Sequence, residues 1–100
     1  MSREVTDMLR RHAENAKLFK AFCDEKRLMI IQSLQGGEKC ICYLMDEMNC
    51  GQSSISYHMK ILCESGIVIS RQDGKWTYYR LSEAGCQTAL KVLESILTSS

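Results

Sequence analysis

The sequence predicts a mainly α-helical domain that carries one β-hairpin, and three observations point to this fold class. The chain has 100 residues, which is the length of a single domain, so we expect one domain over residues 1–100. Apolar residues recur at steps of three and four before Gly66 and after Ser82, as on the inner face of helices. Between these positions, two β-rich runs flank Asp73-Gly74, a dipeptide typical of tight hairpins.

Composition predicts an ordinary globular protein of the cytoplasm. Hydrophobic residues make up 45% of the chain and charged residues 25%, which excludes a disordered tail. The longest apolar run spans only Cys40 to Met45, and the N-terminus has no apolar signal stretch, so neither a membrane partner nor export is expected. We therefore expect the six cysteines to be reduced thiols rather than disulfides.

Two helices are predicted in the first third of the chain. The first has apolar or small residues at helical spacing: Val5, Met8, Leu9, His12, Ala13, Ala16, Phe19 and Phe22. The second begins after Asp24, whose carboxylate is a good helix N-cap, and continues to Gly36. After a polar first turn over residues 24–27, its expected inner face consists of Leu28, Ile31 and Leu34.

A helix-turn-helix is predicted next. Residues 40–48 have a helical pattern of apolar side chains, and a turn through Gly51 separates them from a second helix. Ser53 is the expected N-cap of that second helix, and Gly66 is expected to end it in a left-handed conformation. The inner face of the second helix is predicted to carry Ile55, Met59, Leu62 and Cys63.

The rest of the sequence predicts a wing and a last helix. The β-rich runs at residues 67–69 and 76–79 form the expected hairpin around Gly74. A last helix begins near Ser82 and is expected to bury Cys86, Ala89, Leu90, Leu93, Ile96 and Leu97. This order of elements is a winged helix-turn-helix, a scaffold that reads DNA.

The outer face of the second helix of the pair is predicted to bind double-stranded DNA. At 100° per residue, this polar face lies opposite Ile55 and carries Ser53, Ser54, Ser56, Tyr57 and Lys60. Such side chains donate hydrogen bonds to phosphates and base edges. In the wing, Arg71 and Lys75, with Arg80, form a local excess of cations suited to phosphates. The alternative is that the serines only cap the helix and that the charged hairpin is only solvated.

Four motifs resemble the ArsR/SmtB family of metal-responsive repressors. They are Leu18 to Arg27, Glu38 to Cys42, Ser53 to Met59 and Gly74 to Ser82, which occur in the family's order and spacing. The resemblance implies a homodimer with the first and last helices at its interface, and one recognition helix for each half of a near-palindromic operator. It also implies that an ion, bound as an inducer, releases the DNA.

Within this resemblance, Cys40 and Cys42 are the expected ion ligands. Two soft thiolates favour As(III) or Sb(III), and after them Cd, Pb or Cu(I), as the inducer, and no permanent cofactor is expected. Residues i and i+2 of a regular helix point about 200° apart, so we expect the first helical turn to unwind when both sulfurs bind one ion. The alternative is that both cysteines are small buried hydrophobes.

The third ligand is left open by the sequence alone. The arsenic sensors that this chain resembles carry a third cysteine at the position of Met45. Cys50 is the preferred substitute because it lies in the nearby turn, and Cys23 is a further option. Cys63 and Cys86 fall on apolar helix faces and are expected to be core or interface thiols. Met45 and Met48 are thioether candidates for Cu(I).

Other functions fit the sequence less well. The family's zinc site between C-terminal helices is not expected, because residues 82–100 contain no histidine, and His58 is expected to be structural. The family's persulfide sensors carry a cysteine where this chain has Gln32, which disfavours that function. A thiol redox-sensing repressor stays an alternative, because Cys40 and Cys42 could oxidise with a neighbouring thiol. A protein-interaction module without metal sensing is a second alternative. No catalytic motif is present, so an enzyme is not expected.

Overall fold

The computed structural model describes residues 2–98, which form five helices and one three-stranded antiparallel sheet. In chain order the elements are α1 (Arg3–Lys20), α2 (Glu25–Leu34), β1 (Lys39–Cys40), α3 (Ile41–Met48), α4 (Gln52–Glu64), β2 (Val68–Asp73), β3 (Trp76–Leu81) and α5 (Glu83–Leu97). The predicted mainly helical fold with a hairpin wing is therefore confirmed. No helix of these residues is long and apolar enough to cross a membrane.

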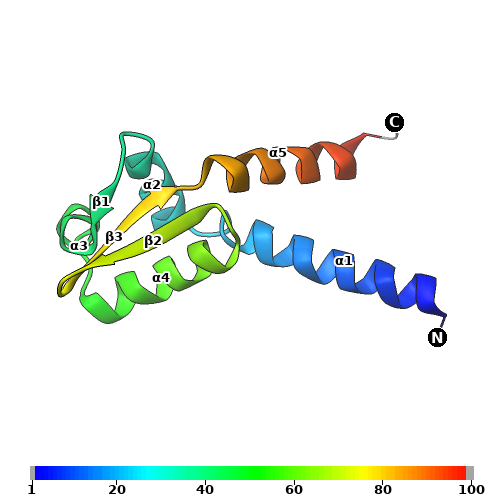
Figure 1. The fold of residues 1–100 in the computed structure, drawn as a ribbon, viewed down its shortest axis with the longest axis horizontal. Coiled ribbons are helices and arrows are strands. Elements are labelled where there is room, and N and C mark those ends of the chain that lie inside the picture. The colour runs from blue at the N-terminus through cyan, green and yellow to red at the C-terminus, as the bar shows by residue number, and fades with distance from the viewer. Residues whose placement is uncertain (1, 99–100) are drawn as a thin grey trace.

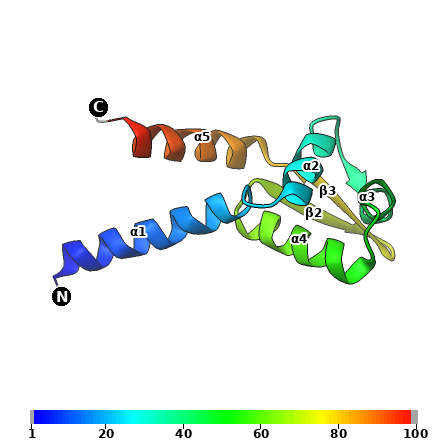
Figure 2. The same ribbon diagram turned by 180° about the vertical axis from the view of Figure 1, so that it is seen from behind.

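The molecule has a body and two arms (Figure 1). The body consists of α2, α3, α4 and the sheet, and the arms are α1 and α5, which leave the body in the same general direction. The view from behind shows the same arrangement, with both chain ends far from the hairpin tip (Figure 2). The shape is accordingly elongated, with principal extents of 47 × 26 × 24 Å.

The core lies inside the body, between α2, α3, α4 and the sheet. The predicted inner face of α4 is confirmed, because Ile55, Met59 and Leu62 are buried and Cys63 is partly buried. Fully buried side chains from the other elements complete the core: Ile30, Leu44, Ile67 and Val68. The fold thus places α4 against the core on one side and leaves its other side exposed.

The inner face of α2 differs from the prediction. Leu28 is 49% exposed, whereas Arg27 and Ile30 are buried beside Leu34. Arg27 enters the interior because its guanidinium donates to the Lys20 carbonyl oxygen and contacts His58, which compensates its buried charge. Because of these contacts, the buried face of α2 includes Arg27 and Ile30, each of which comes one residue before the predicted Leu28 and Ile31.

The arms bury little within one chain. The predicted burial of α5 is wrong for the single chain: no residue of α5 is buried, and Leu90 and Leu97 are 61% and 73% exposed. Leu93 and Ile96 are also exposed, while Cys86 and Ala89 are partly buried. In α1 only Leu18 is buried. Their side chains stay exposed because both arms extend beyond the body, so little of the same chain lies against them.

Helix ends follow local chemistry at most positions. The Asp24 carboxylate accepts from the Arg27 backbone N–H at 3.2 Å, so this predicted N-cap is confirmed. The last helix begins near Ser82 as predicted, and Ser82 Oγ caps it by accepting from the Gly85 N–H at 3.0 Å. The predicted Ser53 cap is wrong, because α4 begins earlier and its N-cap is Gly51. The left-handed Asn49 (φ 51°) ends α3 and redirects the chain there.

The sheet contains one strand that the sequence did not predict. The hairpin is confirmed, with Asp73 opposite Trp76 across a two-residue turn and Gly74 at φ 63°. In addition, β1 pairs with β3, so the strand order is β1-β3-β2. Lys39 lies opposite Tyr79, and Cys40 lies opposite Tyr78. The strand that carries Cys40 is therefore part of the wing's own sheet.

Candidate nucleic-acid interface and candidate metal centre

The outer face of α4 is open to solvent. Tyr57 is 58% exposed, and the other predicted DNA-binding residues of this helix, Ser53, Ser54, Ser56 and Lys60, are also exposed. Together they form a hydroxyl-rich face with one cation. An α-helix that presents such a face fits the major groove of B-DNA, where hydroxyl and amino groups can contact phosphates and base edges.

Two buried polar side chains hold α4 against the start of α2. Arg27 Nη1 donates to His58 Nδ1 at 3.0 Å, and Arg27 Nη2 donates to the Lys20 carbonyl oxygen at 3.0 Å. The Asp24 carboxylate lies 3.9 Å from His58 Nδ1. The pKa of Asp24 is lowered mainly by the hydrogen bond from the Arg27 backbone N–H. These contacts agree with the structural role predicted for His58. The role of Arg27 was missed, because nothing in the local pattern distinguishes it from the solvated charges beside it.

The two predicted wing residues differ in their surroundings. Arg71 donates twice to Glu38, from Nε at 2.8 Å and from Nη2 at 2.7 Å, and its Nη1 lies 3.5 Å from Asp73. The hydrogen bond from Arg71 lowers the pKa of Glu38. Lys75, by contrast, lies at the exposed hairpin turn with its ammonium 5.3 Å from the Trp76 ring centre. Lys75 therefore offers its charge to solvent, whereas Arg71 is engaged by carboxylates.

The two candidate thiol ligands contact each other. Cys40 is the N-cap of α3 and has an extended backbone (φ −72°, ψ 148°), while Cys42 lies in the first turn of the helix. The Cys42 thiol donates to Cys40 Sγ at 2.9 Å. The prediction that α3 must unwind to bring these sulfurs together is wrong, because Cys40 is outside the helix. The two sulfurs are therefore adjacent in the structure without any change in α3.

The electrostatics of the pair make its two members unequal. The hydrogen bond from Cys42 lowers the pKa of Cys40, and backbone N–H groups at the start of α3 act in the same direction. The same hydrogen bond raises the pKa of Cys42. Loss of a proton is therefore easier at Cys40 than at Cys42. An ion that binds both sulfurs displaces the thiol protons of both.

The predicted third ligand, Cys50, lies near this pair but is engaged elsewhere. Cys42, Met45 and Cys50 line one open hollow beside the α3–α4 turn. Lys26 Nζ donates to Cys50 Sγ at 3.1 Å. Among residues 2–98, no three side chains of Cys, His, Asp or Glu are grouped closely enough to hold a metal ion. The structure thus brings two thiols together and leaves the third apart.

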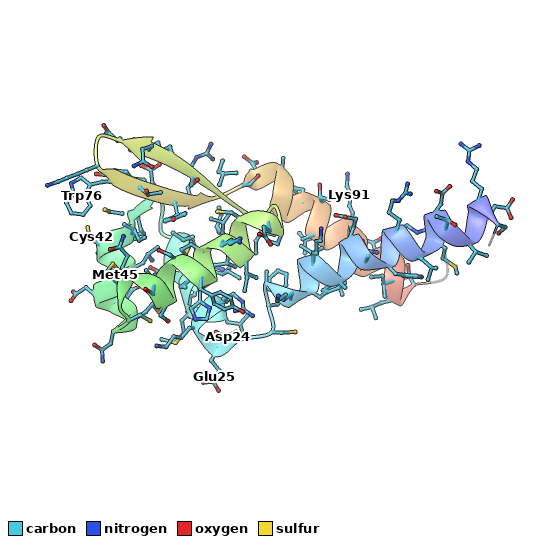
Figure 3. The ribbon with its side chains drawn as sticks, turned by 90° about the horizontal axis from the view of Figure 1, so that it is seen from below. Asp24, Glu25, Cys42, Met45, Trp76 and Lys91 are labelled. Carbon is cyan, nitrogen blue, oxygen red and sulfur yellow. The ribbon has the colours of Figure 1, made fainter. Side chains whose placement is uncertain are left out.

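The view from below relates these parts in space (Figure 3). Cys42 and Met45 of α3 and Trp76 of the wing lie at one end of the molecule. Lys91 on α5 lies in the other half, among the arms. The candidate metal centre is accordingly close to the wing and remote from the free ends of the arms.

Of the remaining cysteines, Cys23 is exposed at the α1–α2 junction. Cys63 and Cys86 are partly buried and pack against the core, and burial raises the pKa of Cys63. These positions agree with structural thiols at Cys63 and Cys86.

Comparison with known proteins identifies the family. The sequence model described as "Bacterial regulatory protein, arsR family" matches residues 24–70. An uncharacterized HTH-type transcriptional regulator of Methanocaldococcus jannaschii is 34% identical over 89 residues, which cover 88% of this chain and 100% of that protein. The arsenical resistance operon repressor of Escherichia coli is 40% identical over 79 residues, covering 78% of this chain and 68% of the repressor.

A solved structure is similar to this chain over the whole length of both. The crystal structure of the transcriptional repressor BigR from Xylella fastidiosa is 35% identical and superposes with a TM-score of 0.65, covering 100% of both chains. The resemblance noted from the four sequence motifs is therefore confirmed. On the strength of its helix-turn-helix, its winged sheet and these relatives, the chain belongs to the arsR family of bacterial regulatory proteins.

Proposed function

We propose that this protein is a homodimeric transcriptional repressor that leaves its operator when a thiophilic ion binds Cys40 and Cys42. The observation that carries the proposal is the 2.9 Å contact between these two sulfurs, of which Cys40 lies on the strand that pairs with the wing and Cys42 lies in α3. As(III) or Sb(III) is the preferred inducer, followed by Cd, Pb or Cu(I), because soft thiolates select such ions. The name of the Escherichia coli relative, an arsenical resistance operon repressor, supports this order.

DNA binding is assigned to α4 and the wing. The exposed residues Ser53, Ser54, Ser56, Tyr57 and Lys60 enter the major groove, where they read bases and hold phosphates. Lys75 and Arg71 contact the phosphate backbone beside the groove, and each such contact contributes to affinity through counterion release.

Dimer formation is assigned to the arms. Apolar side chains of α1 and α5 are exposed in the single chain, among them Met8, Leu9, Leu90, Leu93 and Ile96. Contiguous apolar surface of this kind is normally covered by a partner, and a twofold dimer covers it on both copies. A dimer also presents two α4 helices, which suits an operator with two half-sites about one helical turn apart.

Ion binding is assigned to Cys40 and Cys42, with Cys50 as the third ligand. Trigonal As(III) needs three thiolates, and Cys50 is the thiol that borders the same hollow as Cys42. To join the pair, Cys50 must exchange its hydrogen bond from Lys26 for the ion. That exchange would move the α3–α4 turn, which connects the ion site to the recognition helix.

The test is an anisotropy titration with a labelled duplex. The duplex is selected by the reduced wild-type protein from a random library of about 30 base pairs, which spans two half-sites. As(III) is expected to weaken binding about a hundredfold, which corresponds to a coupling free energy of about 2.7 kcal/mol. Cys40→Ser and Cys42→Ser should bind the duplex normally and lose the response.

Cys23→Ser is the matched control, because Cys23 is exposed and lies outside the hollow. Loss of response in Cys50→Ser would identify the third ligand. If the double variant of Cys40 and Cys42 still releases DNA with As(III), the proposed site is wrong. If As(III) has no effect and hydrogen peroxide releases the DNA, the protein is the redox sensor named above as the alternative.

A further inference from the structure

The guanidinium of Arg71 is half-exposed and is held by carboxylates of its own chain. Its Nε and Nη2 donate to the two carboxylate oxygens of Glu38 at 2.8 and 2.7 Å, and its Nη1 lies 3.5 Å from Asp73 Oδ2. The group also stacks over the Tyr78 ring, 4.5 Å from its centre. Each guanidinium nitrogen therefore faces a protein oxygen, and although some of the five N–H groups stay open to solvent, Glu38 neutralises and orients the charge that would hold a DNA phosphate.

Glu38, the carboxylate that holds Arg71, belongs to the segment of the ion site. Glu38 comes two residues before Cys40, just ahead of β1. In the sheet, Cys40 on β1 and Arg71 on β2 both lie opposite Tyr78 on β3. Residues directly opposite each other in an antiparallel sheet share one face, so Cys40, Tyr78 and Arg71 form a row across the sheet. The bidentate pair thus links the wing to the strand of Cys40.

We propose that Glu38 competes with operator DNA for Arg71, and that an ion bound at Cys40 and Cys42 shifts this competition toward Glu38. This inference rests on the proposed function. Without the ion, the peptide bond to Ile41, the pairing of β1 with β3 and the Cys42–Cys40 thiol hydrogen bond hold the Glu38 segment beside α3. An ion bound to both sulfurs replaces the thiol hydrogen bond with two stronger bonds, so the segment is held more firmly in the position in which Glu38 pairs with Arg71. The wing then has one cation fewer for phosphate, without any change in its own sequence or fold.

The competition is tested first without any ion. Glu38→Gln removes the charge that holds Arg71 and should raise affinity for the selected duplex about fivefold, the range of exposed ion pairs. Glu47→Gln is the matched control, since Glu47 is an exposed carboxylate on α3 that accepts a hydrogen bond from Tyr43. It removes the same charge and should change affinity much less.

A double-mutant cycle separates competition from simple repulsion of DNA. If Glu38 acts through Arg71, Glu38→Gln should have no effect in the Arg71→Ala background. If Glu38→Gln changes duplex affinity equally in the wild-type and Arg71→Ala backgrounds, Glu38 does not compete with DNA for Arg71. The same conclusion follows if Glu38→Gln and Glu47→Gln change duplex affinity equally. Circular dichroism of each variant checks that the fold is retained, which is expected because Glu38, Glu47 and Arg71 are all exposed.

The ion's part is tested by repeating the titration with As(III). Glu38→Gln should retain As(III) binding, measured by sulfur-to-arsenic ultraviolet absorbance, but lose at least half of the fold-change in DNA affinity. A full response in Glu38→Gln would overturn the coupling. A wild-type protein that ignores As(III), Sb(III), Cd, Pb and Cu(I) would instead refute the proposed function, while the cycle measured without ion would still decide whether Glu38 competes with DNA.

Discussion

The body and the arms use apolar residues in opposite ways. In the body, α4 buries Ile55, Met59 and Leu62 against α2, α3 and the sheet. In the arms, α5 has no buried residue, although its apolar pattern is as regular as that of α4. A regular apolar face therefore shows that a helix will be covered, but not which chain will cover it. In the proposed dimer, the arms are the part of this fold that a second copy completes.

The largest expected effect is on the stability of the body. Leu62→Ala removes a fully buried side chain and should lower the free energy of unfolding by about 3 kcal/mol. Leu90→Ala, at an exposed position of α5, should cost far less in dilute protein. Urea denaturation of both variants measures the difference. Similar losses would contradict the division into a covered body and uncovered arms.

The second effect is on assembly. Leu93→Glu places a charge on the apolar face of α5 and should dissociate the dimer, because burying an unpaired carboxylate is costly. Duplex affinity should then fall at least about tenfold at nanomolar protein, since binding becomes linked to dimerisation. Analytical ultracentrifugation gives the oligomeric state directly. An intact dimer of this variant would place the interface elsewhere.

The third effect compares helix caps in the two regions. Asp24 caps α2 in the body, and Ser2 caps α1 in an arm by accepting from the Val5 N–H at 3.2 Å. Asp24→Ala should lower the melting temperature by about 5 °C, the shift expected for loss of a cap in a small domain. Ser2→Ala should lower it less, because the end of an arm can fray while the body remains folded.

The Asp24 contribution also has a definite pH dependence. The pKa of Asp24 is lower in the folded protein than its ordinary value, so folding favours the charged form. Its stabilisation is therefore complete above the ordinary pKa of an aspartate and is lost as the pH falls through the lowered value. The difference between wild type and Asp24→Ala should shrink over that acidic interval. A difference that is constant with pH would mean that the charge plays no part.

The smallest expected effect compares two exposed lysines. Lys75 is in the wing and Lys91 is on α5 (Figure 3). Lys75→Ala should weaken duplex binding a few-fold and reduce the slope of log K against log salt by about 0.9 for each phosphate that the side chain neutralises. Lys91→Ala should leave the slope unchanged. Equal slopes for both variants would show that the wing does not contact phosphate.

The sequence predicts what local rules determine. Asp24 caps α2, the last helix begins near Ser82, Gly66 ends α4 and Asp73-Gly74 turns the hairpin, because each depends on a few neighbouring residues. The inner face of α4 also follows from spacing alone. These local rules are sufficient to predict the fold class and the exposed face of α4.

Features that depend on distant partners were missed. A two-residue strand such as β1 has no pattern of its own and exists only because β3 is beside it. The position of Cys40 outside α3 follows from that pairing, so the sulfur geometry could not be obtained from the C-x-C spacing. Likewise, Arg27 is buried and Arg71 is paired because of His58 and Glu38, which are 31 and 33 residues away.

The hollow beside the α3–α4 turn has a consequence for engineering. None of its six lining residues, Cys42, Met45, Asp46, Asn49, Cys50 and Gly51, is buried. Substitutions there do not open a cavity in the core, so directed evolution can vary the donor atoms while the scaffold stays intact. Met45 is the natural first position, because a cysteine introduced there adds a thiolate one helical turn from Cys42. A panel of such variants would form a set of biosensors that share one DNA sequence and differ in the ion they report.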